Sequence, residues 1–218
     1  MSELETAKIH EIIGTPDMAE ILRDQVAAVL SLELQNQYAM AQEAALPDAR
    51  EFNIPVFVEN GRPYESSGGK PLMRFVNVLL PKITVPASNP RMGAQKEQAV
   101  FFIDCAACGN DCGTFRDDKS AAIRAWKLTR IVRRILMSGE YAYLGLRGIV
   151  GSRIITSMEA GTPEKPELDR ESALSYMLVR ITLEAQFLEK FIGTEGPPLE
   201  LISFEVEPSS GEILANGI

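Results

Sequence analysis

Apolar residues recur at spacings of three and four in two stretches of the chain, and this periodicity predicts two amphipathic helices. The first covers residues 17–45, with Thr15 as its N-cap and Pro16 at its first helical position. The second covers residues 117–138, with acidic residues at its start, arginines near its end and Gly139 as its C-cap. The apolar stripe of the first helix is Met18, Leu22, Val26, Leu30, Leu34, Tyr38, Ala41 and Ala45, and that of the second is Ala121, Ala125, Leu128, Val132, Ile135 and Leu136.

Runs of apolar and β-branched residues, closed by turn residues, predict the strands of a sheet. Three short strands are expected between the helices, over residues 53–59, 75–80 and 98–105. Later strands are expected over residues 143–158, 173–187 and 199–206.

The strands at 143–158 and 173–187 are long enough to form a large antiparallel hairpin. The linker between them, residues 161–170, is polar and holds two prolines, and a bend is expected in the first strand at Gly148 or Gly151. The second strand alternates cleanly, as a sheet with one buried face requires. Its apolar face is Met177, Val179, Ile181, Leu183, Ala185 and Phe187, and its polar face is Arg180, Thr182, Glu184 and Gln186.

This order of elements predicts a single α+β domain over residues 1–218. We expect a mainly antiparallel, mixed β-sheet with two principal helices packed on one face and a long β-hairpin arm. Residues 1–14 are expected to be a flexible arm, 60–98 a loop or extended arm around the strand at 75–80, and 207–218 a tail.

Composition and charge narrow the function. The chain has 218 residues, 45% of them hydrophobic, which is enough for one good-sized core. Its net charge is −8, which disfavours binding to the negatively charged phosphate backbone, so no sequence-specific nucleic acid binding is expected. The first ten residues lack the apolar core of a signal peptide, and no stretch is apolar enough to span a membrane, so no membrane partner is expected.

The sharpest chemical candidate is a cluster of three cysteines, Cys105, Cys108 and Cys112. The first two have zinc-knuckle spacing, but a structural zinc site needs four ligands. Asp111 would be a poor fourth ligand, a partner subunit could supply another, and the single histidine, His10, is far away in the sequence. The alternative is a strand end with buried thiols, and on balance no metal and no cofactor is expected. An odd number of cysteines does not indicate a disulfide framework, so a reducing, cytosolic setting fits best.

Catalytic constellations are not evident either. A serine or cysteine nucleophile usually needs a positioned base, and His10 is the chain's one histidine. The glycine-rich stretch at 66–70 does not form a phosphate loop, because Lys70 is followed by Pro71 and a strand rather than by a helix. We therefore expect no catalytic residues and no enzyme.

The second predicted helix has four basic residues at spacings of three and four, which places them on one face. This stripe could meet an acidic partner surface, and on so acidic a chain the partner could be another copy. The alternative is a solvated helix face, which is the commoner outcome for a run of charge. The four residues are Arg124, Lys127, Arg130 and Arg134.

The two helices, the sequence IleLeuMetSerGlyGluTyrAlaTyrLeuGlyLeu over residues 135–146, and the long hairpin after it resemble the tail terminator, or tail-completion, proteins of long-tailed bacteriophages and prophages. The resemblance implies a structural virion protein rather than an enzyme. It implies a subunit that closes into a homo-oligomeric ring, commonly a hexamer, capping the tail tube and contacting head-connector proteins. DNA would pass through the lumen without being read. The location implied is the virion, and the host cytoplasm during assembly.

A ring requires a heterologous interface whose rotation closes. The long hairpin, 143–187, and the second helix are the expected contact, because strand edges can extend a neighbour's sheet. The alternatives are a head-completion or tail-tube subunit, and, in another class, a small metal-binding protein using the three cysteines. The interface candidates are Arg124, Lys127, Arg130, Arg134, Tyr143, Arg147, Arg180 and Glu184.

Overall fold

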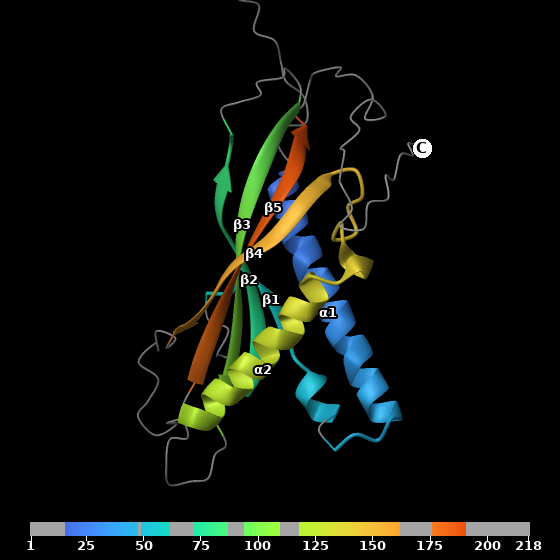
Figure 1. Cartoon of the computed structure of the whole chain (residues 1–218), viewed down its shortest axis with the longest axis vertical. Helices are drawn as coiled ribbons and strands as arrows, with labels where there is room; N and C mark the ends of the chain where they lie inside the picture. Colours follow the sequence, from blue (N-terminus) through green and yellow to red (C-terminus); the bar gives the residue numbers. More distant parts are fainter. Residues whose placement is uncertain are drawn as a thin grey trace, which may run out of the picture.

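The protein is described by a computed structural model (Figure 1). Two α-helices lie in the part of the chain that the structure describes, α1 (Met18–Glu43) and α2 (Asp118–Leu136), and short 3₁₀ helices cover Ala49–Phe52 and Gly139–Tyr141. The strands are β1 (Val56–Val58), β2 (Arg74–Thr84), β3 (Ala94–Cys108), β4 (Val150–Gly161) and β5 (Tyr176–Lys190). The structure describes residues 16–47, 49–61, 72–86, 94–109, 118–161 and 176–190. The arm at 1–14, the last strand at 199–206 and the tail at 207–218 that the sequence predicts lie outside these residues.

The strands form one five-stranded sheet in the order β1-β2-β3-β5-β4. β1 runs parallel to β2, and the other neighbours are antiparallel. β4 and β5 pair as the predicted long hairpin, and among the described strands β1 and β4 are the outer ones. The predicted α+β fold with a mixed, mainly antiparallel sheet is confirmed.

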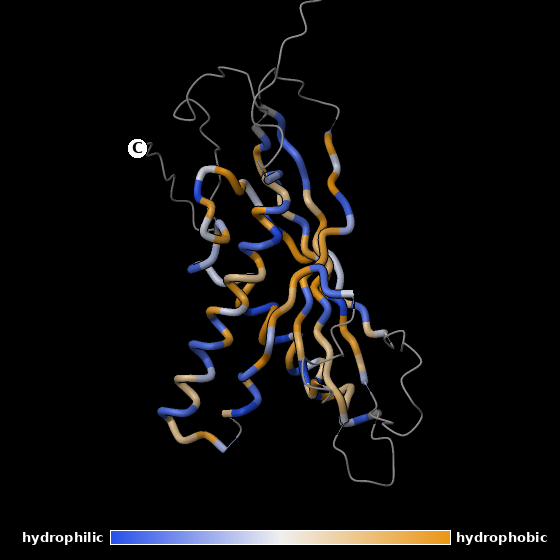
Figure 2. Tube along the Cα trace, turned by 180° about the vertical axis from the view of Figure 1, so that it is seen from behind, coloured by the Kyte–Doolittle hydropathy of each residue, from blue (hydrophilic) through white to orange (hydrophobic). Residues whose placement is uncertain are grey.

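Both helices cover the same face of the sheet, and the core lies between them and the strands (Figure 1). Alternate residues of the central strands point into this core, as the pleat requires. In Figure 2 the apolar positions concentrate along the middle of the strands, whereas hydrophilic and apolar positions alternate along the helices. The strand residues buried in this core include Val76, Val78, Phe101, Ile103, Cys105, Ile181, Leu183 and Phe187.

The predicted apolar stripe of α2 is buried along its whole length, and that of α1 is buried from Leu22 to Leu34 and again at Ala41. α1 starts later than predicted, at Met18, with Asp17 as N-cap and Pro16 ahead of the helix. Thr15 lies outside the described residues. The Asp17 side chain makes no capping bond; instead the Met18 amide donates to Glu189 of β5 at 3.0 Å. A tertiary carboxylate thus satisfies one free amide at the positive end of the helix.

The predicted strand at 143–158 is wrong over its first seven residues. Residues 143–149 form turns, with φ of 51° at Leu144, 78° at Gly145 and 85° at Gly148, and β4 begins only at Val150. Gly139 is not the C-cap of α2, because the helix ends at Leu136 and Gly139 opens a 3₁₀ helix. Apolar residues in this segment alternate because a tight turn buries them against the core, and such burial mimics the pattern of a strand.

The predicted loop or arm at 60–98 is also shorter than expected. β2 continues past Pro81 to Thr84 and still pairs with β3 there, and β3 already begins at Ala94, where it pairs with β5. β1 is too short to accompany them, since its last pairing is with Val78. Proline has no backbone N–H to donate to a neighbouring strand. Pro81 therefore lies at a position where no described neighbour requires that donor, and a strand tolerates proline at such a position.

Candidate interaction surface

The four basic residues predicted to form one stripe on α2 have different surroundings in the structure. Arg124 donates through Nη1 to the carbonyl of Cys108 at 3.4 Å, and Lys127 forms an ion pair with Glu51. Arg130 and Arg134 are exposed on the side of α2 that faces away from the core. The stripe is therefore divided into two residues that tie α2 to other elements and two that face outward.

Glu51 lies between two cations from different elements. Lys127 approaches it from α2, and Arg74 of β2 donates to it at 3.0 Å. Burial acts to raise the pKa of Glu51, but the hydrogen bond from Lys127 and the charge of Arg74 outweigh it and hold that pKa below its ordinary value. This carboxylate joins the 3₁₀ helix at Ala49–Phe52 to both the sheet and α2.

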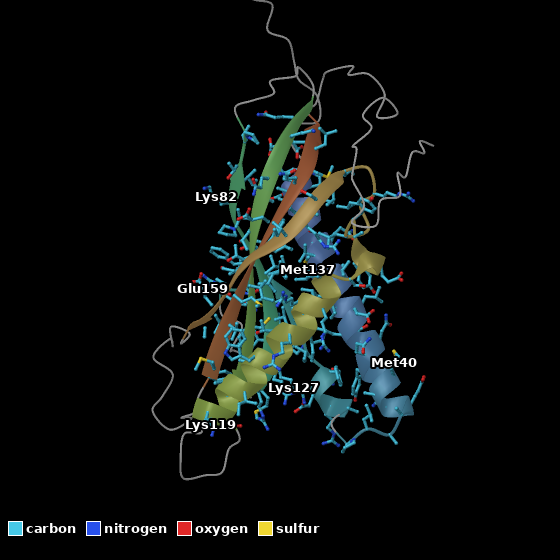
Figure 3. All side chains as sticks on the ribbon, viewed as in Figure 1. Met40, Lys82, Lys119, Lys127, Met137 and Glu159 are labelled. Carbon is cyan, nitrogen blue, oxygen red and sulfur yellow. The ribbon has the colours of Figure 1, made fainter. Side chains whose placement is uncertain are left out.

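The outward side of α2 also carries apolar side chains. Ile123 is 60% exposed, and Met137, just after the helix, is 47% exposed. Trp126 packs against the buried cluster of Ala107, Ala125 and Val179. Ile123 and Trp126, but not Met137, border a groove of about 450 Å³ together with the cations beside them. Its described lining is Lys119, Ala122, Ile123, Trp126, Lys127 and Arg130. We call this lining the α2 outer surface; two of its residues, Lys119 and Lys127, are labelled in Figure 3.

Sequence reasoning missed Ile123 and Trp126. The signal was present, because both apolar residues fall off the core stripe of Ala121, Ala125 and Leu128. Two apolar residues three apart on the polar side of a helix mark either a partner surface or packing against a segment outside the helix pair.

The hairpin candidates Arg180 and Glu184 are engaged within the sheet. Arg180 holds Asp104 with two bonds of 2.7 and 2.8 Å, and its guanidinium lies 4.5 Å from the ring centre of Phe102. Glu184 accepts a bond from Gln98. Their neighbours Ile181 and Leu183 point into the helix-covered core, so Arg180 and Glu184 lie on the opposite face of the sheet.

Tyr143 and Arg147 lie in the turns before β4, where Tyr143 is half-buried and Arg147 is exposed. This connection is anchored by Arg153 of β4, whose guanidinium donates to the carbonyls of Tyr141 and Ser138, the latter at 2.7 Å. Burial lowers the pKa of Arg153. The Tyr141 hydroxyl also donates to Glu33 of α1 at 2.8 Å. The turns are thus fixed to α1 and to the sheet.

β4 is a twelve-residue outer strand that pairs with β5 and with no other described strand. The ladder shifts register between Val150 and Ser152 and again between Ile155 and Ser157, so the strand carries two irregularities. Such bulges limit uncontrolled edge pairing. Ile154 lies between them and is 58% exposed, and Glu159 marks the later part of the strand (Figure 3).

Cys105 and Cys108 lie on opposite faces of β3. Cys105 is in the core beneath the helices, and its burial raises the pKa of the thiol to about 12. Cys108, three residues along the strand, instead contacts the sulfur of Met73 at 3.2 Å. A spacing of three in a strand reverses the side-chain direction, so these two thiols cannot share one metal ion. Cys112 lies outside the described residues.

No family model and no curated protein sequence matches this chain. No helix within the described part of the chain is long and apolar enough to cross a membrane.

Charge is strongly segregated in the chain. α2 contains six lysines and arginines and one aspartate, for a net +5. The whole chain has a net −8, so the residues outside α2 sum to −13. The α2 outer surface is therefore a basic and apolar patch on an acidic protein, which suits contact with an acidic, apolar surface.

Proposed function

We propose that this chain is the subunit of a closed homo-oligomeric ring, of the tail terminator or neck type that caps a phage tail tube and joins it to the head. The observation that supports this most is the α2 outer surface, where Ile123 and Trp126 are flanked by cations on a chain of opposite net charge. A copy of the same chain is an acidic partner that is always present.

A closed ring needs two different, complementary surfaces on each subunit. The α2 outer surface offers one, since its charge is opposite to that of the remaining chain. β4 offers backbone groups along its outer edge and an exposed Ile154. An edge strand is suited to adding a neighbour's strand or loop through main-chain hydrogen bonds.

The engaged residues refine the list of interface candidates. Lys127, Arg180 and Glu184 contact partners within their own chain, so their substitution would disturb the fold as well as a contact. Arg130 and Arg134 are the exposed basic positions through which the proposal is tested. A head-completion subunit would use the same surfaces, and a tail-tube subunit would stack them into open-ended tubes.

The experiment is electron microscopy of the purified protein with a charge-reversed variant, Arg130→Glu/Arg134→Glu. The native chain is expected to form discrete rings, and the variant to form several-fold fewer. The matched control is Lys82→Glu/Arg50→Glu, which makes the same change of charge at exposed positions on other elements. Open-ended stacks would favour the tube alternative, and equal ring formation by both variants would remove α2 from the interface.

A further inference from the structure

The groove of the α2 outer surface has a definite chemistry. Ile123 and Trp126 supply its apolar floor, and Lys119 and Arg130 stand one turn before and after them. The aliphatic stems of these cations extend the apolar surface, while their charges remain in water. An extended or helical segment that alternates apolar and acidic residues would match this arrangement.

The chain itself contains such a segment after β5. Residues 191–218 hold five glutamates and no lysine or arginine. Within them, residues 199–207 read LeuGluLeuIleSerPheGluValGlu, so three of the five glutamates lie among five large apolar side chains. No described residue belongs to this stretch, and its sequence alone supplies the complementarity in charge and hydrophobicity.

Reach favours a neighbouring copy as the source of the segment. Trp126 packs beside Val179, and β5 continues for eleven residues to Lys190, a distance of about 36 Å. Figure 1 shows the end of β5 and the start of α2 at opposite ends of the molecule. Leu199 follows Lys190 by nine residues, and a fully extended chain of that length spans only about 32 Å. Only a nearly straight connection could therefore bring residues from Glu200 on to the groove of their own copy, since a random-coil chain of thirteen residues, the separation of Ser203 from Lys190, spans only about 20 Å. A neighbouring copy that brings its groove towards the end of β5 avoids this stretching.

We propose that the groove bordered by Ile123, Trp126, Lys119 and Arg130 binds the acidic, apolar segment 199–207 of a neighbouring copy. The apolar side chains of the segment cover Ile123 and the outer side of Trp126, and its glutamates pair with Lys119 and Arg130. The inference rests on the proposed self-association and names the contact that joins one subunit to the next.

Trp126 is the one tryptophan of the chain, so its fluorescence reports on the groove directly. Quenching by acrylamide is measured on the full chain at high and low protein concentration. Dilution is expected roughly to double the quenching constant, because leaving neighbours uncover the indole. Glu205→Lys/Glu207→Lys and, separately, Lys119→Glu/Arg130→Glu are expected to show the high value at every concentration.

Mixing these two variants provides the decisive arm. The basic segment of the first variant is complementary to the acidic groove of the second, and the native segment of the second is complementary to the native groove of the first. The mixture is therefore expected to recover the protected, native quenching constant. The matched control is Glu195→Lys/Glu212→Lys, which alters the same tail by the same charge outside residues 199–207 and is expected to behave as the native chain.

Other results would overturn the inference. Equal quenching in the Glu205/Glu207 variant and the native chain would exclude this segment as occupant. Protection that persists unchanged on dilution would place the segment in the groove of its own copy or leave the groove without a neighbour. Rings that persist in the Glu205/Glu207 variant would refute this contact and leave the proposed ring standing, whereas a native chain without rings would refute the ring itself.

Discussion

Two arginines of the long hairpin stabilise the protein in different ways. Arg180 pairs with the carboxylate of Asp104 across the sheet, where the charges satisfy one another. Arg153 donates to two backbone carbonyls, and its Nε is buried with no hydrogen-bond partner among the described residues. The charge of Arg153 is therefore less fully compensated than that of Arg180. Arg153 stabilises the protein by holding the turn that follows α2 in place.

Replacing Arg153 tests that role. Arg153→Met keeps most of the aliphatic stem and leaves the carbonyls of Ser138 and Tyr141 without their donor. We expect a loss of about 1–3 kcal/mol in the free energy of unfolding, measured by urea denaturation. Arg147→Met, at an exposed position in the same connection, is expected to change it by less than about 0.5 kcal/mol. Equal losses for Arg153→Met and Arg147→Met would show that the hydrogen bonds of the Arg153 guanidinium do not stabilise the turn.

The ion pairs of Glu51 predict that the free energy of unfolding depends on pH in the acidic range. Its pKa is lower in the folded than in the unfolded chain, so its contribution is complete above the unfolded value, near pH 4.3, and is lost as the pH falls through the folded value. Glu51→Gln is expected to cost about 1 kcal/mol at neutral pH and progressively less below about pH 4. Urea denaturation across this range measures the difference, with Glu43→Gln at the exposed end of α1 as control. A cost for Glu51→Gln that stays constant with pH would contradict the ion pairs.

At the scale of elements, periodicity was sufficient for α2 and β5 and for the central part of α1, because each turns one apolar side to one core. It failed where burial has another cause. Leu144 is fully buried in a turn, which gives residues 143–149 the look of a strand. For the surface, spacing placed Arg124, Lys127 and Arg130 on one helix face, but the contacts that separate them come from Glu51 and Cys108, on elements that helical spacing cannot show.

The turn between α2 and β4 can be tested through its glycines. Gly145 and Gly148 have φ of 78° and 85°, and a Cβ at Gly145 would also lie 3.4 Å from the Gln25 side chain. Substitution of either by alanine is expected to cost about 1 kcal/mol or more in the free energy of unfolding. Gly139→Ala is the control, because a Cβ there meets nothing within 4 Å and its φ lies outside the left-handed region. Thermal or urea unfolding that ranks Gly139→Ala with the other two would contradict the turn geometry.

At the scale of the whole molecule, the central property is an uneven distribution of charge and apolar surface. α2 is net positive on a chain that is otherwise strongly negative, and its outer side exposes apolar residues. β4 adds a long outer strand at one side of the sheet. Two unlike surfaces on one subunit favour head-to-tail association, and closure of that association gives a ring.

Absolute mass in solution, measured by light scattering over a wide range of protein concentration, tests this claim most directly. The proposed ring predicts a discrete species at a fixed multiple, about six, of the 24.0 kDa chain, and its dissociation in high salt as the α2 contacts are screened. A single 24.0 kDa species at every concentration and salt condition would contradict the proposed self-association.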